Sequence, residues 1–288
     1  MAYEIYLGCE QLGGTDWGDY DIEETIKLSQ EAIKLGFHGF DVADCYSLGL
    51  AEERLSQVFE KAGNGISFIT KGGIRWKKNN SRAITWKDSR PEYLQTAVKN
   101  SLKRLKIDRI PIYLLHWHDL NVDIFESLNL LNNLKTRGYI EKIGIANPSL
   151  DWLSNTKILS LIDHLQVNDN ILKPFPFPRS FNANKIKYNI KVSSYGILSH
   201  GLLTTKYNKK YSFPKNDRRH RLYDFNDKKF ILKRNILFQQ SVSQGKSIEE
   251  LSILYSVRNA SIDILIIGCK TRNQAISNIN NFQKSINV

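Results

Sequence analysis

The 288-residue chain contains few cysteines and no long apolar run. Cys9, Cys45 and Cys269 are odd in number and far apart, which fits neither a disulfide framework nor a zinc-ligand pattern and is typical of a reducing compartment. No apolar run approaches the roughly 18 residues that span a bilayer. The chain also does not begin with a basic segment followed by an apolar core. We therefore expect a cytoplasmic protein with no membrane partner and no resident metal.

Acidic residues are also scarce relative to basic ones. The chain has 29 Asp and Glu residues and 41 Lys and Arg residues, which gives a formal net charge of +12. A nucleic-acid partner would account for this excess. However, the lysines are scattered along most expected helices, and the densest basic group, between Lys206 and Tyr223, is interleaved with aromatic residues. We expect an anionic cofactor or substrate near this segment, and no nucleic acid.

Short apolar runs alternate with amphipathic segments along the whole chain. The runs are too continuously apolar to have a solvent-exposed face, which is typical of parallel strands covered by helices. Eight such units predict an α/β fold, a closed (β/α)8 TIM barrel, in a single domain over residues 1–288. The expected strands are Ile5–Gly8, Gly39–Ala43, Ser67–Lys71, Ile110–Leu115, Lys142–Ala146, His164–Val167, Lys191–Tyr195 and Ile264–Ile267.

An open, doubly wound sheet is the alternative fold. It is disfavoured because no Gly-x-Gly-x-x-Gly motif follows an early strand, as a dinucleotide-binding Rossmann unit requires. Residues 203–229 form an unusually long connection for a compact domain, and such loops usually contribute to function. We predict that this loop lies over a cofactor or substrate site.

Polar side chains close nearly every expected strand. In a barrel, the carboxyl-terminal strand ends and the loops after them face one pocket. One such residue can simply point to solvent, but a set at the same end of the barrel predicts an active site. The set consists of Asp41 with Tyr46 just beyond it, Lys71, His116, Asn147, Gln166 with Asn170, Tyr195 and Lys270.

Four of these residues suggest a specific chemistry. A tyrosine phenol has an ordinary pKa near 10, and a neighbouring ammonium lowers it. We expect Lys71 to lower the pKa of Tyr46, Asp41 to hold the lysine charged, and His116 to donate a hydrogen bond to a substrate oxygen. This set can protonate a carbonyl oxygen but contains no obvious nucleophile, so a hydride from a nicotinamide would complement it.

Several ordered segments carry a resemblance to one family. They are Leu7-Gly8 with Leu12-Gly13-Gly14, Phe40-Asp41-Val42-Ala43-Asp44-Cys45-Tyr46, Glu52-Glu53-Arg54-Leu55, Ile69-Thr70-Lys71-Gly72-Gly73, Tyr113-Leu114-Leu115-His116-Trp117, Ile143-Gly144-Ile145-Ala146-Asn147, and Ser194-Tyr195-Gly196 with Gly201-Leu202-Leu203. The chain resembles an aldo-keto reductase over essentially its full length. The resemblance implies an NAD(P)H-dependent reduction of an aldehyde or ketone, with Asp41, Tyr46, Lys71 and His116 as the catalytic residues.

The resemblance also implies a cofactor site. Asn147 and Gln166 would hold the nicotinamide carboxamide, and the Tyr195 ring would stack on the nicotinamide. Lys270 and Arg272, at the start of a helix, would bind a 2′-phosphate, which favours NADPH while leaving NADH possible. Ala146, Ser199 and Thr205 depart from the usual family residues. The remaining cofactor positions that the resemblance implies are Gly196, Leu198, Gly201, Thr271, Gln274 and Asn278.

The substrate pocket is the least specified part of the prediction. We expect Trp17, Trp76, Trp86 and Trp117 to line it. Sugars, sugar derivatives, small aldehydes and quinone-like carbonyls all stay open as the small-molecule substrate, and no oligomeric state is predicted. A metal pair of His116 with His118 is disfavoured, because zinc sites need three or four ligands.

Two other functions remain as alternatives. One is a Schiff-base lyase in which Lys71 is the nucleophile. The other is a subunit that binds or senses a nicotinamide without turning it over.

Overall fold

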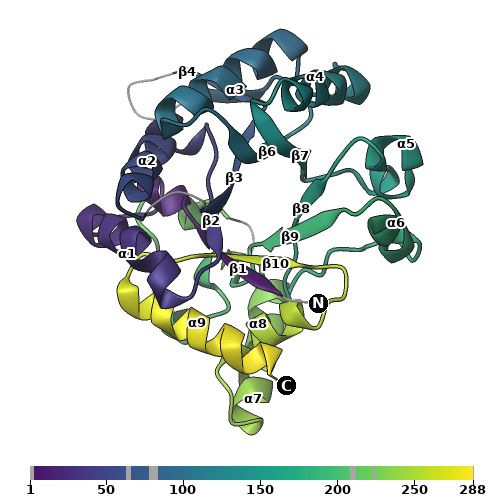
Figure 1. The fold of residues 1–288 in the computed structure, drawn as a ribbon. Coiled ribbons are helices and arrows are strands. Elements are labelled where there is room, and N and C mark those ends of the chain that lie inside the picture. The colour runs from purple at the N-terminus through teal and green to yellow at the C-terminus, as the bar shows by residue number, and fades with distance from the viewer. Residues whose placement is uncertain (1–2, 63–65, 78–83, 208–211, 223–224, 288) are drawn as a thin grey trace.

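Parallel strands form a closed barrel surrounded by helices (Figure 1). The computed structural model describes residues 3–62, 66–77, 84–207, 212–222 and 225–287. The strands follow one another around the barrel in the order β1-β10-β9-β8-β7-β6-β3-β2, and β2 pairs with β1 to close it. This confirms the predicted fold class. The strands are β1 (Glu4–Gly8), β2 (Gly39–Asp41), β3 (Ser67–Gly72), β6 (Ile110–Leu115), β7 (Ile140–Ala146), β8 (His164–Asn168), β9 (Lys191–Tyr195) and β10 (Ile264–Gly268).

Helices follow the strands and cover the outside of the barrel (Figure 1). Among those described, none is long and apolar enough to cross a membrane. The α-helices are α1 (Ile22–Leu35), α2 (Leu50–Ala62), α3 (Pro91–Leu105), α4 (Ile124–Thr136), α5 (Thr156–Leu159), α6 (Phe181–Lys187), α7 (Lys228–Ser243), α8 (Ile248–Val257) and α9 (Arg272–Ile286).

Local sequence signals set several helix ends. The Asp21 carboxylate accepts the backbone N–H groups of Glu23 and Glu24 at the start of α1, and Gly36 ends that helix with a φ of 111°. This is the left-handed conformation that glycine adopts at little cost. Pro91 occupies the first turn of α3, where its missing N–H has no helical partner to lose.

Strand alternation divides the core into two layers. Tyr6, Ile69 and Leu114 belong to a buried cluster inside the barrel, whereas their neighbours Leu7 and Leu115 pack in the larger cluster under the helices. Successive side chains of a strand point to opposite faces. The inward face of β3 therefore continues from Ile69 to Lys71, and that of β6 continues beyond Leu114 to position 116.

Two parts of the described structure were not predicted. An antiparallel hairpin, β4 (Ile74–Lys77) with β5 (Ile84–Lys87), follows β3. The short helix α6 follows β8, in a segment for which the sequence pattern suggested no helix.

Candidate active site

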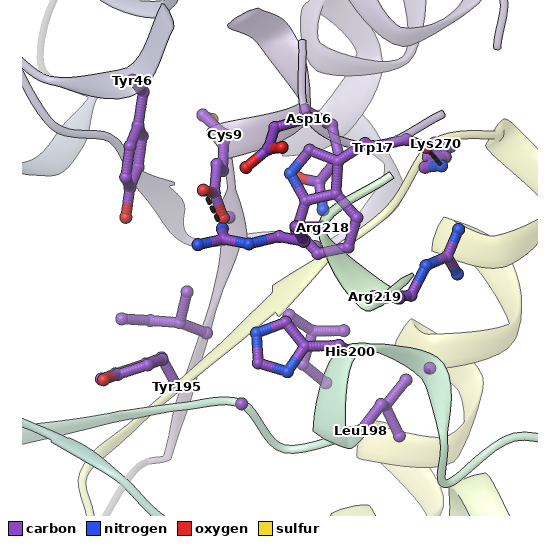
Figure 2. A pocket seen from close by; sticks show the side chains of 18 of the residues that line it. Cys9, Asp16, Trp17, Tyr46, Tyr195, Leu198, His200, Arg218, Arg219 and Lys270 are labelled. Atoms are coloured by element: carbon purple, nitrogen blue, oxygen red, sulfur yellow. Dashed lines mark hydrogen bonds and ion pairs between the residues drawn. The ribbon is translucent and has the colours of Figure 1, made fainter. Parts of the chain in front are cut away.

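A cavity of about 1500 Å³ opens at the carboxyl-terminal ends of the strands. It extends from the barrel mouth, near Tyr46 and His116, to the first turns of α9. Figure 2 shows part of its wall, with Tyr46, Tyr195 and His200 around the open space. The cavity therefore lies where the sequence predicts an active site.

A buried ion pair lies at the base of this cavity. The Lys71 Nζ atom is 2.8 Å from Asp41 Oδ1, and the lysine side chain is 0% exposed. Nζ also donates to the Val42 carbonyl at 2.8 Å, and Gln166 Nε2 donates to Asp41 Oδ2 at 2.8 Å. Because buried charges need close partners, these contacts fix both Lys71 and Asp41 in place.

Tyr46 stands above this pair, in the 3₁₀ turn η2 (Tyr46–Gly49) that follows β2. The Lys71 Nζ atom lies 5.3 Å from the centre of the Tyr46 ring, so the ammonium and the phenol ring are neighbours. The expected lowering of the Tyr46 pKa is wrong, however. Burial, and then the Asp41 carboxylate, hold that pKa well above its ordinary value. The phenol therefore stays protonated at neutral pH.

His116 forms the adjacent wall. Its ring meets the Tyr46 ring edge to face, with centroids 6.0 Å apart. Burial, and then the charge of Lys71, hold the pKa of His116 well below its ordinary value, so the imidazole is neutral. The Cys45 Sγ atom lies 3.6 Å from His116 Nδ1, and burial raises the pKa of this thiol. A protonated thiol can donate to Nδ1 when the imidazole carries its proton on Nε2.

The family comparison agrees with this arrangement. The model of the Aldo/keto reductase family matches residues 4–287. The chain belongs to the aldo/keto reductase family. It is therefore an oxidoreductase that acts on carbonyl compounds, and the family uses a nicotinamide cofactor.

Named relatives of this aldo/keto reductase include bacterial enzymes. It is 28% identical to the aldo-keto reductase YhdN of Bacillus subtilis (strain 168) over 310 residues, which cover 100% of this chain and 89% of that protein. It is 33% identical to the NADH-specific methylglyoxal reductase of Escherichia coli (strain K12) over 172 residues, 56% of this chain and 52% of that protein. The glycerol dehydrogenase AKR11B4 from Gluconobacter oxydans shares the fold, with a TM-score of 0.81 and 24% identity over 98% of this chain and 89% of that one.

The predicted nicotinamide-binding residues meet along one wall of the cavity. The Tyr195 hydroxyl donates to Asn147 Oδ1 at 2.6 Å, and Asn147 Nδ2 donates to the His116 carbonyl at 3.1 Å. Gln166 uses its Nε2 on Asp41, which leaves its carbonyl oxygen to accept an amide N–H. The Tyr195 ring offers an aromatic face and the Gln166 side chain offers an amide acceptor, which suits a nicotinamide ring with its carboxamide.

The segment after Tyr195 turns tightly along the same wall. Gly196 and Gly201 have φ angles of 77° and 96°, and Gly196, Leu198 and Gly201 line the cavity. Ser199, which stands where the family usually has glycine, has a φ of 45°. It therefore adopts the left-handed region that the glycine would have favoured. Thr205, the second such position, donates its backbone N–H to Glu249 Oε1 at 2.8 Å.

At the far end, three predicted residues of the adenosine segment line the cavity: Lys270, Gln274 and Asn278. The Lys270 backbone N–H donates to Gln274 Oε1 at 2.9 Å. Two other predicted residues do not line it. Thr271 caps α9 by accepting the Gln274 N–H, and the Arg272 side chain pairs with Glu31 at 2.9 Å on the surface. Lys270 is thus part of the cavity wall, whereas the Arg272 side chain lies outside it.

Of the four tryptophans predicted to line the substrate pocket, two line the cavity and two do not. Trp17 and Trp117 line the cavity. Trp76 and Trp86 do not. Both lie in the unpredicted hairpin β4–β5, from which Ile74 and Thr85 line the cavity instead. There, Arg104 lies over the Trp76 ring at 5.9 Å. The placement of Trp76 and Trp86 in the pocket is therefore corrected.

The loop over residues 203–229 contributes two described parts to the cavity wall, Thr204–Tyr207 and residues within 215–221. The second part is joined to the loop after β1 by a bridge between Trp17 and Asp217 and by an ion pair between Arg221 and Asp16 at 2.6 Å. Residues 208–211 and 223–224 of this loop lie outside the described structure.

Sequence reasoning missed two charged residues of the site. Glu10, just after β1, forms an ion pair with Arg218, and both line the cavity. Glu10 was detectable, because it follows a strand end as the other site residues do. Arg218 was not singled out, because its position depends on how the long loop folds back.

The described residues contain no group of three or more His, Cys, Asp or Glu side chains arranged to hold a metal ion. The His118 Nδ1 atom lies 3.4 Å from Ser89 Oγ, and its ring packs edge to face on Trp152. His118 thus packs against Trp152 and Ser89, whereas the His116 ring contacts Tyr46 and Cys45.

The contact between Cys45 and His116 leads to a testable expectation. Cys45→Ala removes the donor to Nδ1, whereas Cys45→Ser keeps one. Because one hydrogen bond contributes about 0.5–1.5 kcal/mol, we expect kcat of the alanine variant to fall by about 2–10-fold, with less change in the serine variant. Steady-state kinetics measure this, and ¹⁵N NMR of His116 reports its tautomer. Equal kcat values and an unchanged tautomer in the alanine variant would show that Cys45 does not orient the imidazole.

Proposed function

We propose that this aldo/keto reductase reduces an aldehyde or ketone to the alcohol with NADPH, and that Tyr46 donates the proton. The observation that carries the proposal is the position of Tyr46. Its ring lies 5.3 Å from the Lys71 ammonium and against the neutral His116 imidazole, in the cavity that also contains Asn147 and Tyr195.

Each of these groups has a role in the proposal. The His116 Nε2–H donates a hydrogen bond to the carbonyl oxygen and orients it. A bound nicotinamide supplies hydride to the carbonyl carbon. Tyr46 keeps its proton until negative charge develops on the oxygen, because its pKa is high. An alkoxide is a much stronger base than a phenolate, so the proton then moves to the substrate oxygen, and the Lys71 ammonium stabilises the phenolate left behind.

Steady-state NADPH oxidation over a panel of anionic and neutral carbonyls tests the proposed function. Turnover with at least one carbonyl is expected, with the alcohol as product. NADPH binding without turnover of any carbonyl would instead favour a sensing subunit. The lyase alternative has little support, because Lys71 is fully buried and paired with Asp41, which leaves no free amine to attack a substrate.

Lys270 is the residue we propose for the 2′-phosphate. Its Nζ donates to the Trp17 carbonyl at 2.5 Å and lies 4.7 Å from the Tyr20 ring centre. Burial, and then the charge of Arg219, lower the pKa of Lys270 to about 8. The lysine is therefore cationic below this pH and neutral above it.

This pKa predicts a pH-dependent cofactor preference. As pH rises from 7 to 9, Lys270 loses its charge, so we expect the Kd for NADPH to increase by about tenfold while the Kd for NADH stays nearly constant. Fluorescence titrations with both cofactors measure this. In Lys270→Gln the NADPH dependence should disappear, whereas the matched surface variant Arg272→Gln should keep it. The same pH dependence in Lys270→Gln would assign the phosphate contact to another group.

A further inference from the structure

The turn that carries Tyr46 has an unusual backbone. Ser47, Leu48 and Gly49 follow one another with φ angles of 48°, 59° and 94°, all in the left-handed region. Residues with a side chain visit this region mainly one at a time, because their Cβ atom then approaches the following carbonyl oxygen. Such a conformation persists only where its surroundings fix it, often at functional sites. Contacts outside the turn must therefore hold it in this form.

One contact joins the turn to the loop after β1. The 3₁₀ turn η1 (Glu10–Gly13) ends against Ser47. A Cβ atom placed on Gly13 would lie 2.1 Å from Ser47 Oγ and 2.7 Å from Ser47 Cβ, and the Ser47 hydroxyl lies 2.5 Å from Thr15 Oγ1. Ser47 thus fills the space into which any residue other than glycine at position 13 would put its side chain.

A second contact holds the other end of the turn. A Cβ atom placed on Gly49 would lie 2.7 Å from Cδ of Arg104, on α3. Arg104 is fixed by the fully buried Glu52, because its Nε and Nη2 atoms both lie 2.7 Å from Glu52 Oε2. Glu52 Oε1 also accepts the Thr70 hydroxyl at 2.6 Å. Since Gly49 is held on this side, a displacement of Ser47 passes along the chain to Tyr46.

The two contacts lie outside the cavity, whereas the residue that they support faces it. Gly13 and Arg104 do not line the cavity wall, but Tyr46 does, and Figure 2 shows its ring directed into the open space. We propose that Gly13 is a positioning residue, which holds Ser47 and, through the left-handed turn, fixes the Tyr46 phenol where it donates its proton. This inference rests on the proposed function, because it explains how the proton donor of that reaction is placed.

The position of Tyr46 matters because both of its partners are rigid. The ring centre lies 5.3 Å from the Lys71 ammonium, and the His116 ring lies edge to face with it at 6.0 Å. If the turn relaxed to the ordinary right-handed region, the phenol would shift relative to both. A displacement of about 1 Å at a catalytic site can lower a rate by about 10²-fold.

Gly13→Ala tests the inference on the full chain, with NADPH and an aldehyde that the wild-type protein turns over. The added methyl group must displace Ser47 Oγ, so we expect kcat to fall by about 10–100-fold. The Kd for NADPH should stay within about twofold of the wild-type value, because Gly13 does not line the cavity. The solvent deuterium isotope effect on kcat should increase, since proton donation becomes the slow step.

A second substitution separates this contact from general damage. Ser47→Gly removes the side chain that the new methyl group would meet, so the nearest remaining atom is the backbone N of residue 47, at 3.6 Å. Glycine also adopts a left-handed φ at little cost. In the Ser47→Gly background, Gly13→Ala should therefore change kcat by less than about twofold. A fall of about 10–100-fold in both backgrounds would overturn the inference, because the effect of position 13 would then not pass through Ser47.

Gly138→Ala is the matched control for a loss of stability. Gly138, just after α4, also has a left-handed φ, of 85°, but a Cβ atom there meets no described atom within 4 Å beyond its chain neighbours. An alanine with a left-handed φ destabilises the fold. Gly138 does not line the cavity, so this variant should keep the wild-type kcat and isotope effect.

The remaining outcomes have distinct consequences. An unchanged kcat in Gly13→Ala would overturn the inference and leave carbonyl reduction by Tyr46 intact. A lower kcat with an unchanged isotope effect would also overturn it, because Gly13 would then have a structural role only. Absence of turnover with any carbonyl by the wild-type protein would count against the proposed function itself, and the inference would fall with it.

Discussion

The Tyr46→Phe variant is expected to lose carbonyl reduction almost completely. The substitution removes the proton donor and keeps the ring that packs against His116. A general acid contributes about 10²–10⁴-fold to a rate, so we expect kcat to fall by that factor. Because Tyr46 lies outside the wall formed by Asn147, Gln166 and Tyr195, the Kd for NADPH should change little. Stopped-flow reduction and fluorescence titration measure the two quantities.

The reverse pattern would contradict this role. If Tyr46→Phe kept its turnover and lost its affinity for NADPH, the phenol would belong to the cofactor site. Tyr20→Phe is a matched control, because Tyr20 also has a pKa raised by burial and its hydroxyl donates to the Gln11 carbonyl. This variant should turn over carbonyls at a rate much closer to that of the wild type.

The second large effect concerns the buried pair of Lys71 and Asp41. Lys71→Met leaves the Asp41 carboxylate buried without its cation, and breaking a buried pair in this way costs about 3–5 kcal/mol. We expect the free energy of unfolding to fall by that amount in urea denaturation, and reductase activity to be lost as well. An unchanged unfolding midpoint would show that the pair does not hold this part of the barrel together.

A double variant separates stability from catalysis. Replacing both members of a buried pair with apolar residues is often neutral for stability. We therefore expect Asp41→Leu/Lys71→Met to regain much of the lost stability and none of the lost activity. If this double variant regained activity together with stability, Lys71 would have a structural role only.

The barrel was predictable because its signals are local. Most strands are continuous apolar runs such as Ile264–Ile267, and amphipathic helices alternate with them, one of which ends at the turn residue Gly36. The inward position of Lys71 follows from the two-residue period of a strand that also buries Ile69. Such patterns do not depend on distant parts of the chain.

The hairpin and α6 were not predictable in the same way. The strands β4 and β5 have burial patterns that include many exposed positions, so they lack the apolar run by which the barrel strands were recognised. The helix α6 has only seven residues, too few for a clear helical period. Trp76 was misplaced for this reason, because the hairpin directs its ring toward Arg104.

The electrostatics of the site were the hardest part to predict. The sequence places Tyr46 near Lys71, but the direction of the Tyr46 pKa depends on burial and on the Asp41 charge, which are properties of the folded site. Arg218 and Arg272 show the same limit. Either could bind a phosphate, yet Arg218 pairs with Glu10 in the cavity wall and Arg272 pairs with Glu31 on the surface.

Isotope transfer tests the central claim most directly. We would supply the wild-type protein with NADPH carrying deuterium at both hydrogens of the nicotinamide C4 carbon, together with an aldehyde that it turns over. The account predicts an alcohol with one deuterium on the carbinol carbon. An alcohol without deuterium, or a substrate imine trapped on Lys71 by borohydride, would contradict it.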